Sequence, residues 1–301
     1  MHNQHVTILL ATYNGETYLK EQLESIIQQT HKHWHIFASD DGSNDRTMTI
    51  LKHYKIQINN GPREGFATNF LFLITKVGMN SDYYAFSDQD DIWDPNKLTR
   101  AIDWLNLVPE DTPALYCGRT HLINDKSISM GYSPLFLKKP AFKNALVQNI
   151  GGGNTMVFNR AALCLLRQTK KHYNVVSHDW WAYLLISGAG GEVYYDSQPN
   201  LHYRQHNANI VGSNSNWMAR IYRVRRLFQG QLKQWIDLNN KVLFSVSHLL
   251  TPENKKILEQ FQLARRSPVI LRLIKLMQLG IFRQTLFGQL GLLIGTLFNK
   301  I

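Results

Sequence analysis

The sequence has little cysteine and no long hydrophobic run. Cys117 and Cys164 are its only cysteines, and both lie in apolar surroundings without the spacing of metal ligands. We therefore expect a reducing compartment, although two cysteines do not exclude a single disulfide. No apolar run reaches the roughly 20 residues that a membrane-spanning helix needs. No signal peptide is expected, because residues 1–4 lead directly into an apolar strand without a basic region or a long apolar stretch.

Two common nucleotide-binding motifs are also missing. After the first predicted strand the chain has Thr12-Tyr13-Asn14-Gly15, where a dinucleotide-binding protein would have a glycine-rich fingerprint. No P-loop is present anywhere in the sequence. Both absences weigh against a dehydrogenase and against a kinase-like NTPase.

Acidic residues are scarce in the C-terminal part of the chain. Residues 217–301 hold 14 Lys and Arg but 3 Asp and Glu, whereas residues 1–216 hold 19 of each. The C-terminal part therefore carries the whole net charge of +11. A composition step this sharp predicts a separate unit over residues 217–301 with a partner of its own.

The first hundred residues alternate between two hydrophobic patterns. Continuous apolar runs typical of buried strands occur at 5–11, 34–39 and 83–86. Segments with apolar residues at helical spacing lie between and after them, at about 19–30, 45–54 and 68–76. Strands that alternate with helices of this length predict an α/β fold with a mostly parallel sheet flanked by helices.

Three carboxylates follow the third predicted strand at once: Asp88, Asp90 and Asp91. Anions this close repel one another, and a divalent cation would relieve the repulsion. Ligands of open α/β sheets bind at the carboxyl ends of strands, so we expect a metal or nucleotide site here. The neighbouring Asp94, followed by Pro95, is instead predicted to cap the next helix. Asp41, after the second strand, should face the same edge of the sheet.

Three further motifs occur beyond residue 150. Glycines 151–153 precede an apolar strand, where they fit either close approach to a ligand or a plain bulged loop. Asp179 stands beside Trp180 and Trp181 at the start of a predicted helix, and adjacent tryptophans suit stacking on sugar rings. His202 and His206 frame an arginine, and a histidine there could complete the ligand set of the acidic cluster.

These motifs together resemble family 2 glycosyltransferases with the GT-A fold, over roughly residues 5–212. The matching segments are residues 11–15, 40–43, 87–93, 151–156, 178–181 and 203–206. The subgroup that the sequence resembles comprises rhamnosyltransferase-like bacterial enzymes of O-antigen, capsule and exopolysaccharide assembly. The resemblance implies a GT-A catalytic domain at 1–216, divided into a nucleotide-sugar-binding half at 1–105 and an acceptor-side half at 106–216.

The resemblance assigns donor binding to residues near the ends of the first three strands and to an arginine in the loop before the helix at 68–76: Ala11, Tyr13, Asp41, Asp88 and Gln89, and Arg63. Tyr13 and Asp41 would form the nucleobase pocket, where Asp41 accepts from the N3–H of uracil or thymine. Asp88 would contact the ribose. Asp90, with His206 or else His202, would hold Mg²⁺ or Mn²⁺ at the donor's diphosphate.

The resemblance also assigns the second half of the reaction. Asp179 matches the carboxylate that acts as catalytic base, and a single displacement predicts inversion at the anomeric carbon. A further group is assigned to the acceptor side or to secondary roles: Asp91, Gly152, Gly153, Asn154, His178, Trp180, Trp181 and Arg204. In this subgroup a single glycine followed by a small residue is common where this chain has Gly152, Gly153 and Asn154. The role of Asp91 stays open.

The implied partners are a UDP- or dTDP-linked sugar and a glycan acceptor, expected to be linked to polyprenyl diphosphate at the cytoplasmic face of the bacterial plasma membrane. The basic C-terminal helices would bind an anionic membrane surface peripherally. A helical bundle that packs on the catalytic domain or forms an oligomer is the alternative. Nucleic-acid binding is not expected, because no recognition module is present. A catalytically silent sugar-nucleotide-binding scaffold and a nucleotidyltransferase remain alternative functions.

Overall fold

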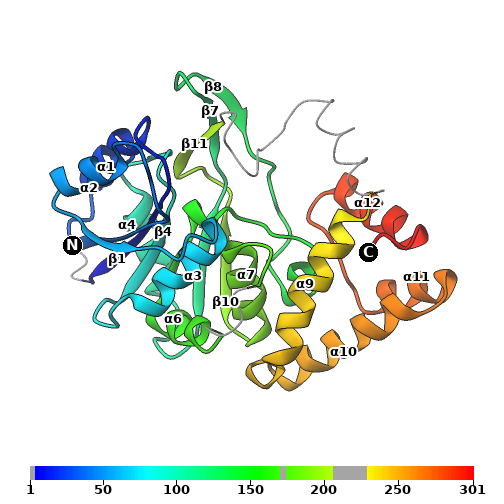
Figure 1. The fold of residues 1–301 in the computed structure, drawn as a ribbon. Helices are drawn as coiled ribbons and strands as arrows, with labels where there is room; N and C mark the ends of the chain where they lie inside the picture. Colours follow the sequence, from blue (N-terminus) through cyan, green and yellow to red (C-terminus); the bar gives the residue numbers. More distant parts are fainter. Residues whose placement is uncertain (1–3, 170–173, 206–228) are drawn as a thin grey trace.

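A computed structural model describes residues 4–169, 174–205 and 229–301, and its centre is a seven-stranded sheet (Figure 1). The strand order is β10-β6-β9-β4-β1-β2-β3. In chain order these strands are β1 Val6–Thr12, β2 Trp34–Asp40, β3 Gln57–Asn60, β4 Tyr83–Ser87, β6 Ala114–Gly118, β9 Val157–Asn159 and β10 Glu192–Asp196. β9 runs antiparallel to β4 and β6, and the other pairs are parallel. The prediction of a mostly parallel α/β sheet is confirmed.

Helices cover both faces of this sheet, which explains why its central strands are continuously apolar. Successive side chains of β1 alternate between the faces: Leu9 joins the core under α3, α6 and α7, whereas Ile8 joins the core under α4. Leu10 packs under α1 and α2. These helices are α1 Leu19–Ile27, α2 Thr47–His53, α3 Phe66–Lys76, α4 Lys97–Leu105, α6 Arg160–Arg167 and α7 His178–Gly188. Figure 1 shows α3 and α7 in front of the sheet.

A smaller sheet stands at the end of the large one where the acidic residues lie. Its strand order is β5-β11-β7-β8, formed by β5 Ile92–Trp93, β7 His121–Asn124, β8 Ser129–Tyr132 and β11 Leu201–Gln205. β5 begins directly after Asp91 and pairs antiparallel with β11. The small sheet therefore ties the acidic segment after β4 to a strand more than a hundred residues later. The short helix α5 Phe142–Ala145 and the 3₁₀ turn η1 Gly153–Thr155 complete this half.

The C-terminal helices pack against the α/β part. They are α9 Gln231–Ser245, η2 Ser247–Leu249, α10 Pro252–Arg266, α11 Val269–Gln278 and α12 Leu286–Leu297. Leu243 of α9 and Phe261 of α10 are fully buried in the same core as Trp181 of α7. Asn254 Nδ2 donates to the Gly188 carbonyl at the end of α7, at 3.0 Å. The expected domain boundary near residue 216 and the first part of the basic region, with arginines at 220, 223, 225 and 226, lie outside the described residues.

One predicted helix cap is wrong. Helix α4 begins at Lys97, its N-cap residue is Asn96, and that residue makes no side-chain capping bond. Asp94 does not cap the helix, because its Oδ1 lies 3.1 Å from Nε2 of His202 on β11. The sequence could not show that His202 is the partner of Asp94, because the two residues are far apart in the chain and come together only in the small sheet.

Candidate active site

The segments that follow β1 and β4 are joined edge to edge. The Tyr13 N–H donates to Gln89 Oε1, and Gln89 Nε2 donates back to the Tyr13 carbonyl, each at 2.9 Å. Ala11 is buried one residue before the end of β1, whereas Tyr13 is 57% exposed. The two hydrogen bonds fix the backbone of Tyr13 while its ring stays open to a ligand, as a nucleobase pocket requires.

The two aspartates after β2 have different surroundings. Asp41 accepts backbone N–H bonds from Arg63 (2.7 Å) and Gly65 (2.9 Å), so it holds the 61–65 segment beside the end of the strand. This contact brings the backbone of Arg63 to the same edge as Asp41. Asp40 accepts from the hydroxyls of Thr12 and Ser43 at 2.9 and 2.6 Å, and is therefore committed to shaping the turn.

Three carboxylates from two distant segments gather at the carboxyl end of β4. Desolvation, followed by the negative charges of Asp90 and Asp179, raises the pKa of Asp88 to about 8. Asp179 is close enough to affect Asp88 although it comes from α7, about ninety residues later in the chain. The site therefore has an excess of negative charge that a hard divalent cation would relieve.

Asp179 lies in the first turn of α7 and is half-buried. One carboxylate oxygen accepts from the Ser177 hydroxyl and from the Trp180 N–H, and the other accepts from the Gly153 N–H at 3.2 Å. Two oxygens held by three donors fix the orientation of the carboxylate without burying it. This arrangement suits a group that must accept a proton from a bound molecule.

The glycine segment is tightly packed against His178. A Cβ placed on Gly153 would lie 2.1 Å from His178 Nε2, so no larger residue fits there without displacing the ring. Gly152 has no such contact with His178; a Cβ there would meet Asn154 Oδ1 at 2.6 Å. The glycines therefore allow close approach between η1 and α7, which brings the Gly153 N–H to Asp179.

The expected stacking of the tryptophans on sugars is wrong in this structure. Trp180 is 5% exposed and Trp181 is fully buried. Their indole N–H groups donate within the protein, to the Ala145 carbonyl at 2.7 Å and to the Thr169 hydroxyl at 3.1 Å. Helix α7 packs against α3, α5, α6 and the large sheet, and Trp180 meets Trp235 of α9, so the adjacent tryptophans are core residues that anchor the start of the helix next to Asp179.

His178 is buried among aromatic side chains next to Asp179. Its ring stacks on Phe70 at 3.9 Å between centroids and meets the edge of Phe86 at 4.8 Å. Neither ring nitrogen has a hydrogen-bond partner among the described residues. Desolvation lowers the pKa of His178 to about 4, against a smaller opposing effect of Asp179.

This histidine should make the protein sensitive to acid. Its pKa is about 4 in the folded chain and 6.5 when exposed, so the unfolded chain binds more protons between these values. Stability is therefore lost as the pH falls from 6.5 towards 4, by about 3 kcal/mol of unfolding free energy. Urea unfolding at both ends of this window should show that His178→Leu is less acid-sensitive than the wild type. The exposed His248→Leu should keep the wild-type sensitivity, and equal slopes for all three proteins would contradict the assignment.

Asp91 lies beneath the site. It is fully buried and accepts from Asn154 Nδ2 (2.5 Å) and from the Arg204 N–H (3.2 Å). Burial, together with the charges of Asp90 and Asp88, raises the pKa of Asp91 well above its usual range. Asp91 thus connects the segment after β4 to η1 and to β11, and its contacts lie within the protein.

Lys97 is a site residue that the sequence reasoning missed. Its side chain is fully buried, its Nζ lies 3.9 Å from the centroid of the Trp93 ring, and that nitrogen has no hydrogen-bond partner among the described residues. Burial lowers the pKa of Lys97 to about 7, and the charge of Asp91 opposes this effect. The sequence did contain an indication that Lys97 is unusual. A lysine in the first turn of a helix interacts unfavourably with the helix dipole, so its presence there needs a local explanation.

Arg204 acts as a buried clamp. Its guanidinium donates to the Asp90 carbonyl (3.0 Å), to the Ser127 hydroxyl (2.9 Å) and to Glu21, and it lies over the Tyr18 ring. The side chain is 1% exposed, so it makes these contacts in the interior of the protein. Arg204 therefore supports the backbone of the acidic segment from below, and Glu21 is a second supporting residue that the sequence did not reveal.

The expected metal ligands are only partly covered by the structure. His206 lies outside the described residues, whereas His202 contacts Asp94 and packs 4.7 Å from the ring of His121. Within the described ranges, no group of three His, Cys, Asp or Glu side chains is arranged to hold a metal ion. Of the expected ligands, Asp90 lies at the site, with Asp88 nearby. A cation bound there would need further ligands from a bound molecule or from residues outside the described ranges.

Comparison with known proteins identifies the family of this chain. The family model described as glycosyl transferase family 2 matches residues 7–169, more than half of the chain. The chain belongs to glycosyl transferase family 2. As a member of this family, the glycosyltransferase moves a sugar from a nucleotide sugar, and the family resemblance seen in its motifs is confirmed.

Curated relatives and solved structures agree with this family. The glycosyltransferase is 34% identical to dTDP-rhamnosyl transferase RfbG of Shigella flexneri over 235 residues, which cover 71% of this chain and 78% of that protein. It is 27% identical to an uncharacterized glycosyltransferase of Rickettsia typhi over 242 residues, covering 76% and 72%. The crystal structure of TarS from S. aureus in complex with UDP-GlcNAc matches with a TM-score of 0.55 at 14% identity, covering 92% and 88%. That last likeness supports the GT-A-like fold.

Proposed function

We propose that this glycosyltransferase is an inverting, metal-dependent enzyme that transfers a sugar from a dTDP- or UDP-linked donor to a hydroxyl group of a glycan acceptor. The observation that carries the proposal is the placement of Asp179 beside Asp88 and Asp90. A base from one half of the domain thereby faces the donor end formed by the other half. Such an arrangement is what a displacement at an anomeric carbon requires.

On the donor side, each residue has a role that its surroundings allow. The exposed Tyr13 ring would stack on the nucleobase, and Asp41 would accept from its N3–H while Arg63 lies beside it. Asp88 would accept from the ribose. Asp90 would hold a divalent cation, since hard carboxylate oxygens suit Mg²⁺ and Mn²⁺. When bound, that cation supplies charge stabilisation for the departing nucleoside diphosphate.

On the acceptor side, Asp179 would take the proton of the attacking hydroxyl. The acceptor oxygen forms a bond to the anomeric carbon while the bond from that carbon to the diphosphate oxygen breaks. The hydroxyl proton passes to the half-buried Asp179 carboxylate, whose orientation the Gly153 N–H maintains. Attack opposite to the leaving group inverts the anomeric configuration.

Two further parts of the proposal concern substrates and location. The relative with 34% identity is described as a dTDP-rhamnosyl transferase, so dTDP-rhamnose is the first donor to test, followed by UDP-linked hexoses. We propose a polyprenyl-diphosphate-linked glycan as acceptor, which places the enzyme peripherally on the cytoplasmic face of the plasma membrane. The positive charge of residues 217–301 supports contact with an anionic surface.

Calorimetry against dTDP-rhamnose and a panel of UDP-sugars, with Mn²⁺ or with EDTA, tests the donor site. We expect one dTDP- or UDP-sugar to bind with Mn²⁺ and to bind far more weakly with EDTA. Asp90→Asn should lose the difference between the two conditions, whereas Asp111→Asn, in an exposed turn, should keep it. Absence of binding by every sugar nucleotide would contradict the proposal. Donor binding without transfer or hydrolysis would favour a silent scaffold, and turnover of a nucleoside triphosphate would favour a nucleotidyltransferase.

A further inference from the structure

Helices α11 and α12 expose a continuous apolar surface. On α11 its residues follow helical spacing at i, i+4 and i+7, and on α12 they occupy the first and second turns: Ile270, Ile274, Met277, Leu286, Phe287 and Leu290. We call these six residues the α11–α12 face. Ile270 is 77% exposed and Leu286 is 84% exposed. Isolated apolar side chains on a surface need no explanation, but six exposed ones on two helices that pack together indicate an interaction site.

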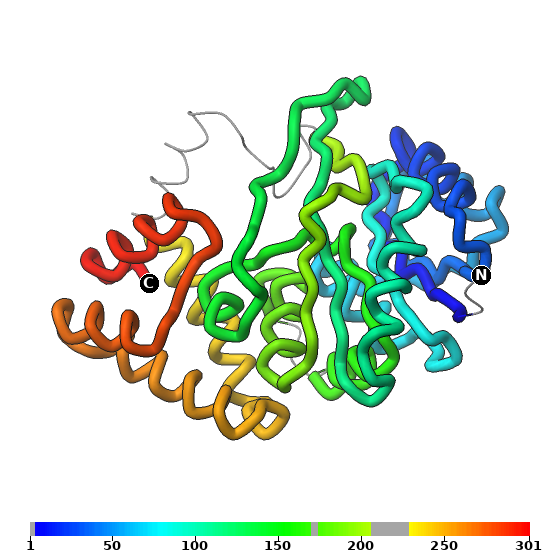
Figure 2. The backbone as a smooth tube through the Cα atoms, turned by 180° about the vertical axis from the view of Figure 1, so that it is seen from behind, coloured from blue at the N-terminus to red at the C-terminus, as the bar shows by residue number. Residues whose placement is uncertain are grey.

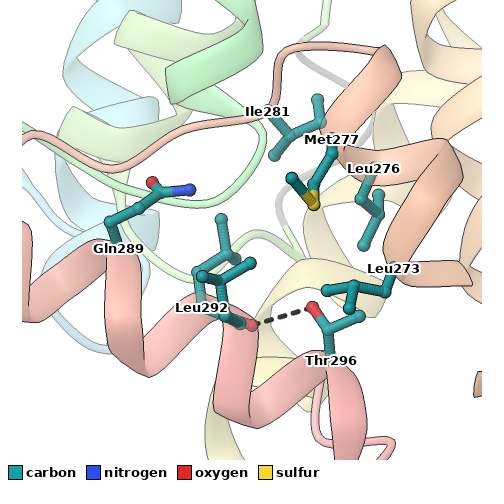
Figure 3. Close-up of a pocket in the computed structure, with 8 residues that line it drawn as sticks. Leu273, Leu276, Met277, Ile281, Gln289, Leu292 and Thr296 are labelled. Atoms are coloured by element: carbon teal, nitrogen blue, oxygen red, sulfur yellow. Dashed lines mark hydrogen bonds between the residues drawn. The ribbon is translucent and has the colours of Figure 1, made fainter. Parts of the chain in front are cut away.

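The two helices are held in a fixed arrangement. The guanidinium of Arg272 on α11 donates to the Thr296 carbonyl on α12 at 3.2 Å and to the Ser267 carbonyl at 3.0 Å. Between the helices lies a cavity of about 220 Å³, lined mainly by apolar side chains such as Leu273 and Leu292 (Figure 3). Met277 belongs to both the cavity lining and the α11–α12 face, so the cavity adjoins this face.

The charges around the α11–α12 face are of one sign. Residues 260–301 contain six Lys and Arg and no Asp or Glu. Arg266 is exposed, and Lys275 and Arg283 are partly exposed. Lys138 adds a cation from the preceding half of the chain, because its Nζ donates to the Arg283 carbonyl at 3.2 Å. The face is thus apolar with a positive border.

The apolar side chains and the positive charges together indicate which kind of partner could cover the α11–α12 face. A second copy of the chain would place like charges opposite one another without any acidic residue from 260–301 to compensate. A bilayer with anionic lipids satisfies both features, since apolar side chains enter the boundary of the acyl region while cations meet the headgroups. No helix within the described ranges is long and apolar enough to cross a membrane, which is consistent with helices that lie in the interface.

We propose that the α11–α12 face docks the enzyme onto an anionic bilayer. The proposal deepens the proposed function, on which it rests for the lipid-linked acceptor, by naming the surface that makes the contact. All four helices contribute to the shared core, α11 through Leu276 and α12 through Leu292, so the α11–α12 face is formed by those side chains of the two helices that stay exposed. Figures 1 and 2 show α11 and α12 at the side of the molecule opposite to α1 and α2, away from the segments assigned to the nucleobase.

Point variants test this surface without disturbing the core. Ile270→Glu combined with Phe287→Glu places two charges on the face, and Leu107→Glu places one on a 79% exposed leucine at the end of α4. Flotation with vesicles of phosphatidylglycerol and phosphatidylcholine should show binding of the wild type and of Leu107→Glu. The double variant should bind at least about tenfold more weakly, because two apolar side chains no longer enter the bilayer. Vesicles of phosphatidylcholine alone should bind every protein more weakly, and added salt should reduce binding.

Several outcomes would overturn the inference. The wild type could fail to bind anionic vesicles, or the double variant could bind as well as the wild type. A wild-type dimer in light scattering that the double variant converts to a monomer would assign the face to a second copy. Calorimetry with dTDP-rhamnose and the panel of UDP-sugars on the same variants separates this inference from the proposed function. Retained donor binding without vesicle binding defeats the docking surface alone, and vesicle binding without any donor binding defeats the proposed function alone.

Discussion

Replacing Asp179 with asparagine should lower kcat by about 10²–10⁴-fold, the usual contribution of a general base, and should leave donor binding close to that of the wild type. Asparagine keeps the shape of the side chain, and its amide oxygen can still accept from the Ser177 hydroxyl and the Trp180 N–H. It cannot accept a proton from an acceptor hydroxyl. The variant should therefore separate turnover from binding.

Two measurements check this expectation. Steady-state transfer gives kcat, and calorimetry with the donor and Mn²⁺ gives the dissociation constant. Asp111→Asn changes the same functional group in an exposed turn and should leave both values unchanged. Near-normal turnover by Asp179→Asn would remove Asp179 from the role of base, and a parallel loss of donor affinity would point to a damaged site.

Replacing Asp91 with asparagine should reduce the free energy of unfolding by about 3–5 kcal/mol at a pH just below 7, because it removes the counter-charge of a buried cation. At lower pH the effect should shrink, because burial raises the pKa of Asp91 and the protonated carboxyl supplies no counter-charge. Lys97 is fully buried, and its ammonium has no hydrogen-bond partner among the described residues. Its pKa of about 7 means that the lysine is charged below that pH, where Asp91 opposes the cost of burial. Raising the pH should lessen the effect, since the neutral amine needs no counter-charge.

A double-mutant cycle tests the pairing of these two residues. Lys97→Met should also destabilise the protein, whereas Asp91→Asn combined with Lys97→Met should be more stable than either single variant. Urea unfolding supplies the four stabilities. Lys20→Met, which removes an exposed pair with Glu24, should cost less than about 1 kcal/mol and serves as the control. Additive losses in the double variant would mean that Asp91 and Lys97 act separately.

Apolar patterns were enough to predict β1, β2, β4 and β9 of the large sheet and most of its helices, but β3, β6 and β10 were not predicted. The strand expected at 34–39 is β2, and the helix expected at 68–76 is α3 with two more residues at its start. Patterns of this kind reflect local burial, which a sequence records directly. The grouping of Asp88 and Asp90 at a strand end also followed from the sequence, because the carboxyl ends of parallel strands share one edge.

Other features depended on partners that are distant in the sequence. Asp94 resembled a helix cap, yet His202 is brought beside it by the pairing of β5 with β11. The sequence suggested that Trp180 and Trp181 stack on sugar rings, because a carboxylate lies next to them. In the structure, the packing around α7 buries both side chains. Asp91 had no definable role before Asn154 and Lys97 were seen around it. No local pattern specifies such contacts.

The contacts of Asp91 also carry a consequence for the order of folding. Its bond to Asn154 joins residues 63 positions apart, and its bond to the Arg204 N–H joins residues 113 positions apart. Contacts of such high sequence separation form only after large loops have closed, which is slow compared with local helix formation. The candidate site should thus be among the last parts to take shape as the chain leaves the ribosome. A nascent chain that stops before β11 would lack the closing strand of this network, so donor binding should begin only when nearly the whole α/β part has been synthesised.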